Sequence, residues 1–238
     1  MAIQTRLVEY THDGVILEGF LAWNDDSDQP RPAVTIAHTW VGRSEFEESK
    51  AIAFAEQGYA AFALDLYGKG VNGSTVEENT ALMTPLMEDR VMLQARMNLA
   101  VTVLREQPEV DGTKIAAAGY CFGGLAVLDL ARSGSDVLGV ISIHGLFFPP
   151  EGVPNKPITA KVLCLHGYDD PMAEPESMTS LASELSASGA DWQVHAYGNT
   201  LHAFTNPGAN NPDMGTLYSA DADRRSWQAL NNFLAELF

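Results

Sequence analysis

Apolar residues along this chain gather in short runs, which are separated by segments with helical spacing. The runs are rich in Val, Ile, Leu and Ala and predict strands, most of them buried on both faces of a sheet: residues 32–38, 60–64, 114–118, 138–143, 161–165 and 192–197. Apolar positions at helical spacing predict helices in the remaining segments, near residues 46–57, 93–104, 125–132, 178–185 and 227–237.

The first part of the chain has a different pattern. Residues 6–10 and 15–20 flank the dipeptide Asp13-Gly14, a strong signal for an antiparallel hairpin. The whole order predicts an α/β fold: a mostly parallel central sheet with an N-terminal antiparallel hairpin and helices on both faces. Residues 69–82 are polar and rich in Gly and Asn, so we expect a surface excursion there. No repeat or linker divides the sequence, which predicts a single domain over residues 1–238.

The composition indicates a globular protein with an acidic surface. Of 238 residues, 46% are hydrophobic and 19% are charged, and the formal net charge is -17. We expect no nucleic acid and no membrane as a partner, because nucleic acids and anionic lipids bind basic surfaces. The N-terminal residues lack the apolar core of a signal peptide, and no apolar run approaches the length of a membrane span.

The two cysteines could in principle pair. However, Cys164 lies within the apolar run 162–165, where a small buried side chain is expected, and Cys121 lies in a very different setting. A reduced, cytoplasmic protein is the simplest interpretation.

Residues 119–124, with the sequence Gly-Tyr-Cys-Phe-Gly-Gly, place Cys121 between a predicted strand and a predicted helix. This is the layout of a nucleophile elbow, a tight turn that projects its central side chain from the sheet. Such a turn leaves little room for the side chains on either side of it, and Gly119 and Gly123 provide the small residues that it needs. A helix N-terminus also favours a thiolate. Cys121 is therefore the candidate nucleophile.

An acid and a histidine follow, each after a later strand. Asp170 comes after the strand ending at residue 165, and His202 after the strand ending near residue 197. The carboxyl ends of parallel strands share one edge of a sheet, and the order nucleophile, acid, histidine is that of the α/β-hydrolase fold. A histidine can take the thiol proton and return it to a leaving group, while a carboxylate orients the ring. Asp169 is an alternative acid, because one of the two is expected to cap the following turn.

Two backbone N–H groups are candidates for an oxyanion hole. Phe122 follows the candidate nucleophile at the helix start, and Trp40 lies in the loop after the strand 32–38. Each such donor contributes roughly 3 kcal/mol of transition-state stabilisation.

The other histidines stand alone. His38, His144, His166 and His195 lie near strand ends or within strands, where structural hydrogen bonding is expected, although His38 and His144 are also placed to line a pocket. The chain has no His-x-x-x-His pair and no Cys-x-x-Cys, so we expect no metal site. Aromatic residues near the expected strand ends predict an apolar pocket: Trp40, Tyr67, Phe122, Phe147 and Phe148.

In combination these segments resemble the dienelactone hydrolase family, the carboxymethylenebutenolidase-like cysteine hydrolases of the α/β-hydrolase fold. The matching segments run in family order: residues 33–42, 58–68, 119–124, 166–171 and 202–204. The resemblance implies the triad Cys121, Asp170 and His202, with Asp170 favoured over Asp169 by the family's Asp-Pro pattern. It also implies that no cofactor is needed and that a small ester or lactone is cleaved.

Two positions depart from the family's pattern. The prototype enzymes carry a glutamate near the resting thiol where this chain has Thr39, and an arginine just past the catalytic histidine, which residues 203–206 lack. We therefore expect a substrate other than dienelactone. Arg43, Lys69 and Arg90 are candidate replacement cations. The other candidate pocket residues are His38, Thr39, Tyr67, His144 and Phe204.

The sequence leaves further functions open. The same triad can serve a thioesterase or an acyltransferase, and the two departures also fit a non-hydrolytic protein in which Cys121 captures a ligand or senses redox state. The first hypothesis is a hydrolase that forms a thioester acyl-enzyme with a small-molecule substrate. The sequence does not decide between a monomer and a homodimer.

Overall fold

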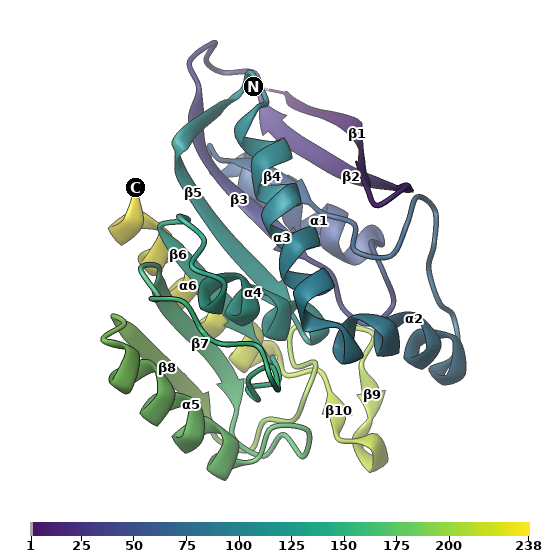
Figure 1. Ribbon diagram of the computed structural model, residues 1–238, viewed down its shortest axis with the longest axis vertical. Helices are drawn as coiled ribbons and strands as arrows, with labels where there is room; N and C mark the ends of the chain where they lie inside the picture. Colours follow the sequence, from purple (N-terminus) through teal and green to yellow (C-terminus); the bar gives the residue numbers. More distant parts are fainter. Residues whose placement is uncertain (1) are drawn as a thin grey trace.

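An eight-stranded sheet forms the centre of the computed structural model, which describes residues 2–238 (Figure 1). Its strands in chain order are β1 (Ile3–His12), β2 (Val15–Asn24), β3 (Arg31–Ala37), β4 (Ala60–Ala63), β5 (Val110–Tyr120), β6 (Gly139–Ile143), β7 (Lys161–Gly167) and β8 (Trp192–Tyr197). Across the sheet the order is β1-β2-β4-β3-β5-β6-β7-β8. The β1–β2 and β2–β4 pairs are antiparallel and the other pairs are parallel. The predicted mostly parallel sheet with an N-terminal hairpin is confirmed.

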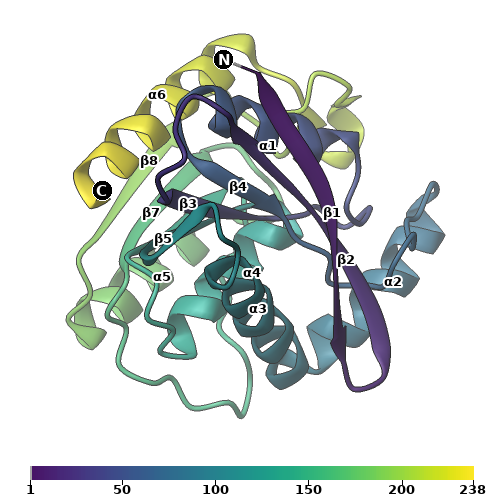
Figure 2. The same cartoon turned by 90° about the horizontal axis from the view of Figure 1, so that it is seen from above.

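Helices cover both faces of the sheet (Figure 2). On one face lie α3 (Arg90–Arg105), α4 (Phe122–Arg132) and α5 (Pro175–Ser188), and on the other lie α1 (Glu45–Glu56) and α6 (Ala220–Leu237). Successive residues of β3 alternate between the two cores: Ala33 and Ala37 pack in the first, Val34 and Ile36 in the second. Because both faces are covered, the parallel strands are apolar throughout, which makes them visible in the sequence.

The expected surface excursion over residues 69–82 is mostly exposed, and its second half forms the start of the helix α2 (Val76–Glu88), which is not among the helices predicted from the sequence. Thr75 caps this helix by accepting the N–H of Glu78, and the Glu78 carboxylate accepts the N–H of Ser74 at 2.8 Å. Leu86 is buried in the core. The capping pair Thr75 and Glu78 is the sequence signal for this helix.

A small ribbon near the C-terminus has no clear sequence signal. It consists of β9 (Asn210–Asn211) and β10 (Thr216–Leu217), joined by a short 3-10 turn at Pro212–Met214. The N–H of His202 donates to the carbonyl of Gly215 at 2.9 Å, and the N–H of Leu217 donates to the carbonyl of His202 at 3.1 Å. The ribbon therefore fixes the backbone of His202.

From residue 2 onward, no helix has both the length and the hydropathy needed to cross a membrane. The single domain expected over residues 1–238 stays a prediction, and Met1 lies outside the described residues.

Candidate active site

The carboxyl edge of the parallel strands brings the predicted site residues to one end of the sheet. Cys121 follows β5, His144 follows β6, Asp170 follows β7 and His202 follows β8, while residues 38–44 form the loop after β3. This arrangement is the one that strand order and parallel pairing require.

Cys121 occupies a strained turn between β5 and α4. Its backbone has φ 56° and ψ -116°, a conformation that residues other than glycine rarely adopt. A Cβ on Gly119 would lie 2.0 Å from the carbonyl oxygen of Gly123, and a Cβ on Gly123 would lie 2.1 Å from that of Ala37. The turn therefore requires glycine on both sides of the cysteine, as expected from the sequence.

His202 is held by Asp170 and not by Asp169. Its Nδ1 lies 2.7 Å from Oδ2 of Asp170, and both side chains are buried. The other oxygen of Asp170 accepts the N–H of Met172 at 2.8 Å. Asp169 is exposed, and its carboxylate accepts the N–H of Thr200 at 3.2 Å. One aspartate thus orients the histidine and the other caps the turn.

The charge state of His202 depends on both of its neighbours. Burial alone would lower the pKa of His202, but the negative charge of the Cys121 thiolate and then the hydrogen-bonded Asp170 carboxylate outweigh burial and raise this pKa to about 10. Within the described chain, Nε2 of His202 has no hydrogen-bond partner of good geometry. An imidazolium with a free Nε2–H can donate to a group bound beside Cys121.

A second histidine, His144, contacts the backbone of the elbow. Its Nδ1 accepts the N–H of Cys121 at 3.1 Å, and its Nε2 lies 2.8 Å from the hydroxyl of Thr205. Burial, together with the charge of His202, holds the pKa of His144 well below 6.5. The ring is therefore neutral and carries its proton on Nε2. It packs edge-on against His202, with ring centroids 5.1 Å apart.

Trp40 and Phe122, whose N–H groups are the predicted oxyanion-hole donors, line the same cavity as Cys121. Phe122 is the first residue of α4, where an N–H has no intrahelical acceptor. Across residues 2–238, neither N–H donates to a turn, loop or cap group or to a side chain. The loop after β3 is anchored, because the N–H of Thr39 donates to Glu47 at 3.1 Å and the hydroxyl of Tyr67 donates to the carbonyl of Trp40 at 3.1 Å. Both N–H groups are available to an oxyanion.

The cavity has a volume of about 350 Å³ and a largely apolar wall. Its residues are Thr39, Trp40, Val41, Phe46, Val76, Met83, Cys121, Phe122, His144, Leu146, Met172, His202, Ala203, Asn206, Ala209, Met214 and Thr216. Hollows of about 430 Å³ and 480 Å³ lie elsewhere, between β8 and α6 and beside Arg90, and contain none of these groups. Within the described part of the chain, no three His, Cys, Asp or Glu side chains are grouped to hold a metal ion.

Most of the apolar wall escapes prediction from the sequence. Val76 and Met83 come from α2, and Met214 comes from the turn between β9 and β10. Val76 and Met83 are seven residues apart and share one helix face, which is the only regular signal among them. Met172 follows the triad acid in a turn, where no periodicity marks it.

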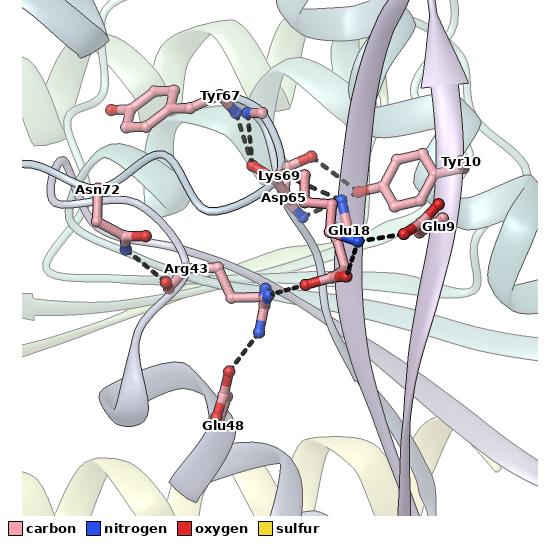
Figure 3. Close-up of polar contacts among 10 residues, drawn as sticks. Glu9, Tyr10, Glu18, Arg43, Glu48, Asp65, Tyr67, Lys69 and Asn72 are labelled. Carbon is pink, nitrogen blue, oxygen red and sulfur yellow. Dashed lines mark hydrogen bonds and ion pairs between the residues drawn. The ribbon is translucent and has the colours of Figure 1, made fainter.

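Two candidate cations, Arg43 and Lys69, do not line the cavity. Both pair with acids, as Figure 3 shows. Arg43 pairs with Glu18 at 3.0 Å and with Glu48. Lys69 pairs with Glu18 at 3.1 Å and with Glu9. These acids lie on β1, β2 and α1, and the ion pairs hold both cations outside the cavity wall.

Arg90, His38 and Phe204 are also predicted to line the pocket, and the structure places all three outside the cavity. Arg90 is buried and donates to Asp129 at 2.8 Å. His38 is also buried, with its Nδ1 2.6 Å from the carbonyl of Thr39 and its Nε2 accepting the N–H of Leu66. Phe204 packs in the core beneath α1 and α6.

Tyr67 stacks on Phe122 behind the wall, with ring centroids 6.1 Å apart. None of His38, Arg43, Tyr67, Arg90 and Phe204 lines the cavity. Thr39 and His144 do line it.

The sequence profile of the dienelactone hydrolase family matches residues 17–238. The chain belongs to this family. It is 35% identical over 149 residues to an uncharacterised protein of Caenorhabditis elegans, covering 61% of this chain and 94% of that protein. It is 25% identical over 231 residues to a Yersinia pestis protein provisionally named carboxymethylenebutenolidase, covering 92% of this chain and 84% of the other.

Among solved structures, a dienelactone hydrolase-like promiscuous phosphotriesterase from metagenomic libraries is 34% identical to this member of the dienelactone hydrolase family. The two superpose with a TM-score of 0.93 over 100% of each chain. The predicted α/β-hydrolase fold is confirmed, and the protein is a hydrolase.

Proposed function

We propose that this dienelactone hydrolase family member is a cysteine hydrolase that cleaves a small ester or lactone through a thioester acyl-enzyme. The observation that carries the proposal is the buried His202–Asp170 pair, 2.7 Å apart, beside the cavity that Cys121 borders. A carboxylate on Nδ1 leaves Nε2 to exchange a proton with the reacting groups, which is what a thiol nucleophile requires.

In the first half-reaction the Cys121 thiolate attacks the acyl carbon. As the carbon–sulfur bond forms, the carbonyl electrons move to oxygen, and the N–H groups of Trp40 and Phe122 donate to this oxyanion. Collapse of the intermediate breaks the ester bond, and the leaving oxygen takes the Nε2 proton of His202. The products are an alcohol, a thioester on Cys121 and a neutral imidazole. From a lactone, the alcohol remains part of the acyl chain.

In the second half-reaction the neutral His202 takes a proton from water, and the hydroxide attacks the thioester. The same two N–H groups stabilise the second oxyanion. Collapse expels the Cys121 thiolate and releases the carboxylic acid, which restores the ion pair of thiolate and imidazolium. Asp170 stabilises the imidazolium at the start and at the end of the cycle.

Relatives support this reaction class. The Yersinia pestis protein carries the provisional name of a lactone-cleaving enzyme, and the metagenomic structural neighbour is described as a phosphotriesterase, which also cleaves esters. Catalysis by a thiol fits a reducing compartment, so the proposal includes a cytoplasmic location. Cys121 and Cys164 are both unpaired.

The test is hydrolysis of p-nitrophenyl butanoate by the wild type, Cys121→Ala and Cys164→Ala. Cys164 is the matched control, because it is buried in β7 and burial raises the pKa of its thiol to about 12. We expect Cys121→Ala to show only background hydrolysis and Cys164→Ala to retain activity. Full activity in Cys121→Ala would overturn the proposal. A stable butanoyl adduct without turnover in the wild type would support a ligand-capturing thiol instead.

A further inference from the structure

The wall of the active-site cavity offers no lysine or arginine to a negatively charged substrate. We propose that this cavity selects uncharged, apolar acyl groups, so that the enzyme cleaves neutral esters or lactones and rejects those that carry a carboxylate. The inference rests on the proposed function, because it names the acyl group that Cys121 would receive.

The apolar part of the wall surrounds the nucleophile. It includes two aromatic rings and several long aliphatic or thioether side chains: Trp40, Phe46, Val76, Met83, Leu146 and Met214. No Lys or Arg of residues 2–238 belongs to the wall. A carboxylate entering here would lose water without gaining a cationic partner, and Thr39, Asn206 and Thr216 offer it only neutral groups. The charge of His202 does not serve as that cation, since the Asp170 carboxylate already pairs with its ring at 2.7 Å.

Cations near the loop after β3 are committed to acids. The guanidinium of Arg43 lies between Glu18 and Glu48, and Lys69 pairs with Glu18 from the other side (Figure 3). The side chain of Arg43 is only 13% exposed, so these acids hold it in place. Moving it to the cavity would break its ion pairs with Glu18, which is 10% exposed, and with Glu48.

Two further cations are held in other ways. Arg90 is 6% exposed and pairs with Asp129, which is fully buried. Lys50 lies over the rings of Phe46 and Trp227, 5.3 Å and 5.6 Å from their centroids, and borders a separate hollow. The net charge of -17 adds a general repulsion of anions.

The test compares two esters that differ only at the far end of the acyl chain. p-Nitrophenyl hexanoate ends in a methyl group, and mono-p-nitrophenyl adipate ends in a carboxylate. We expect kcat/KM to be at least about 100-fold higher for the hexanoate, because the carboxylate of the adipate finds no cation in the cavity. The ratio should persist in about 1 M NaCl, since salt screens surface charge but acts little inside a cavity. Equal kcat/KM values for the two esters, or a ratio abolished by salt, would overturn the inference.

Two substitutions locate the cause of the selectivity. Met214→Arg adds a cation to the wall at a side chain that is 43% exposed, and it should reduce the ratio about tenfold. The matched control is Leu7→Arg on β1, 56% exposed and outside the cavity, which should leave the ratio unchanged.

Arg43→Met should also leave the ratio unchanged, even if it lowers the rates for both esters. A selective loss of adipate cleavage in Arg43→Met would show that Arg43 binds the carboxylate and would contradict the inference. Cleavage of neither ester above the Cys121→Ala background would instead overturn the proposed function itself.

Discussion

The backbone N–H of Cys121 donates to Nδ1 of His144 across 3.1 Å, and the same N–H donates to the carbonyl of Ile143 at 3.0 Å. Both members of the first pair have a left-handed backbone, with φ 56° for Cys121 and 38° for His144. Such conformations persist only where surrounding contacts hold them. The neutral ring of His144 therefore helps to fix the position of the candidate nucleophile.

This contact predicts a positioning role for His144. His144→Leu removes the acceptor and should lower kcat about tenfold with little change in KM, the size expected for loss of one neutral hydrogen bond. His144→Asn keeps an acceptor and should recover most of the activity. Steady-state kinetics with p-nitrophenyl hexanoate measure both effects. If His144→Leu and His144→Asn reduce kcat equally, the hydrogen bond from the Cys121 N–H does not contribute to kcat.

The two neighbouring aspartates give a matched pair of variants. Asp170→Asn leaves the shape of the side chain intact but removes the negative charge that faces His202 Nδ1, so kcat should fall roughly 1000-fold. Asp169→Asn affects only the turn capped through Thr200 and should stay within about threefold of the wild type. The same ester assay measures both. A larger loss in Asp169→Asn than in Asp170→Asn would reverse the assignment.

The raised pKa of His202 predicts a particular pH dependence. The ring keeps its charge through neutral pH and loses it as the pH rises through about 10. Since this pKa lies above the ordinary value of 6.5, the imidazolium adds stability that is complete below pH 6.5 and is lost as the pH rises toward 10. Proton donation from His202 to the leaving group should decline as the pH approaches about 10.

Removal of the thiolate tests the cause of that shift. Cys121→Ala takes away the strongest charge that raises the pKa of His202, so the ring should titrate at a lower pH than in the wild type. An NMR titration of the His202 ring protons measures the difference. Identical titration curves would mean that the thiolate and the imidazolium are not coupled.

The glycines of the elbow predict a stability effect. Gly123→Ala would place a Cβ 2.1 Å from the backbone oxygen of Ala37, and should lower the free energy of unfolding by about 3 kcal/mol. Gly198→Ala is the control, because its Cβ would meet no atom within 4 Å and its change should stay within about 0.5 kcal/mol. Urea unfolding measures both values. A Gly123→Ala protein as stable as the control would show that β3 does not pack closely against the elbow.

The sequence predicts the strands and the elbow turn well because both have local signals. Strands buried on both faces are continuous apolar runs, and the elbow is marked by glycines that its geometry requires. In the sequence only the family's Asp-Pro pattern favours Asp170 over Asp169, since both follow the same strand. The structure adds the contact of Asp170 with His202.

The substrate cavity is predicted less well because its wall depends on long-range placement. Arg43 belongs to the loop after β3, yet it pairs with Glu18 and Glu48 and does not line the cavity. Conversely, Met83 and Met214 reach the wall from segments distant in sequence, and no local pattern marks them for that role.

The central claim is that Cys121 carries the acyl group. Wild-type protein is mixed with saturating p-nitrophenyl hexanoate, quenched in acid during the first turnover and digested for mass spectrometry. If Cys121 is the nucleophile, the wild type shows a burst of p-nitrophenol and one hexanoyl group on the peptide that contains Cys121, and Cys121→Ala shows neither. A burst with unmodified Cys121, or with the acyl group on another residue, would contradict this claim.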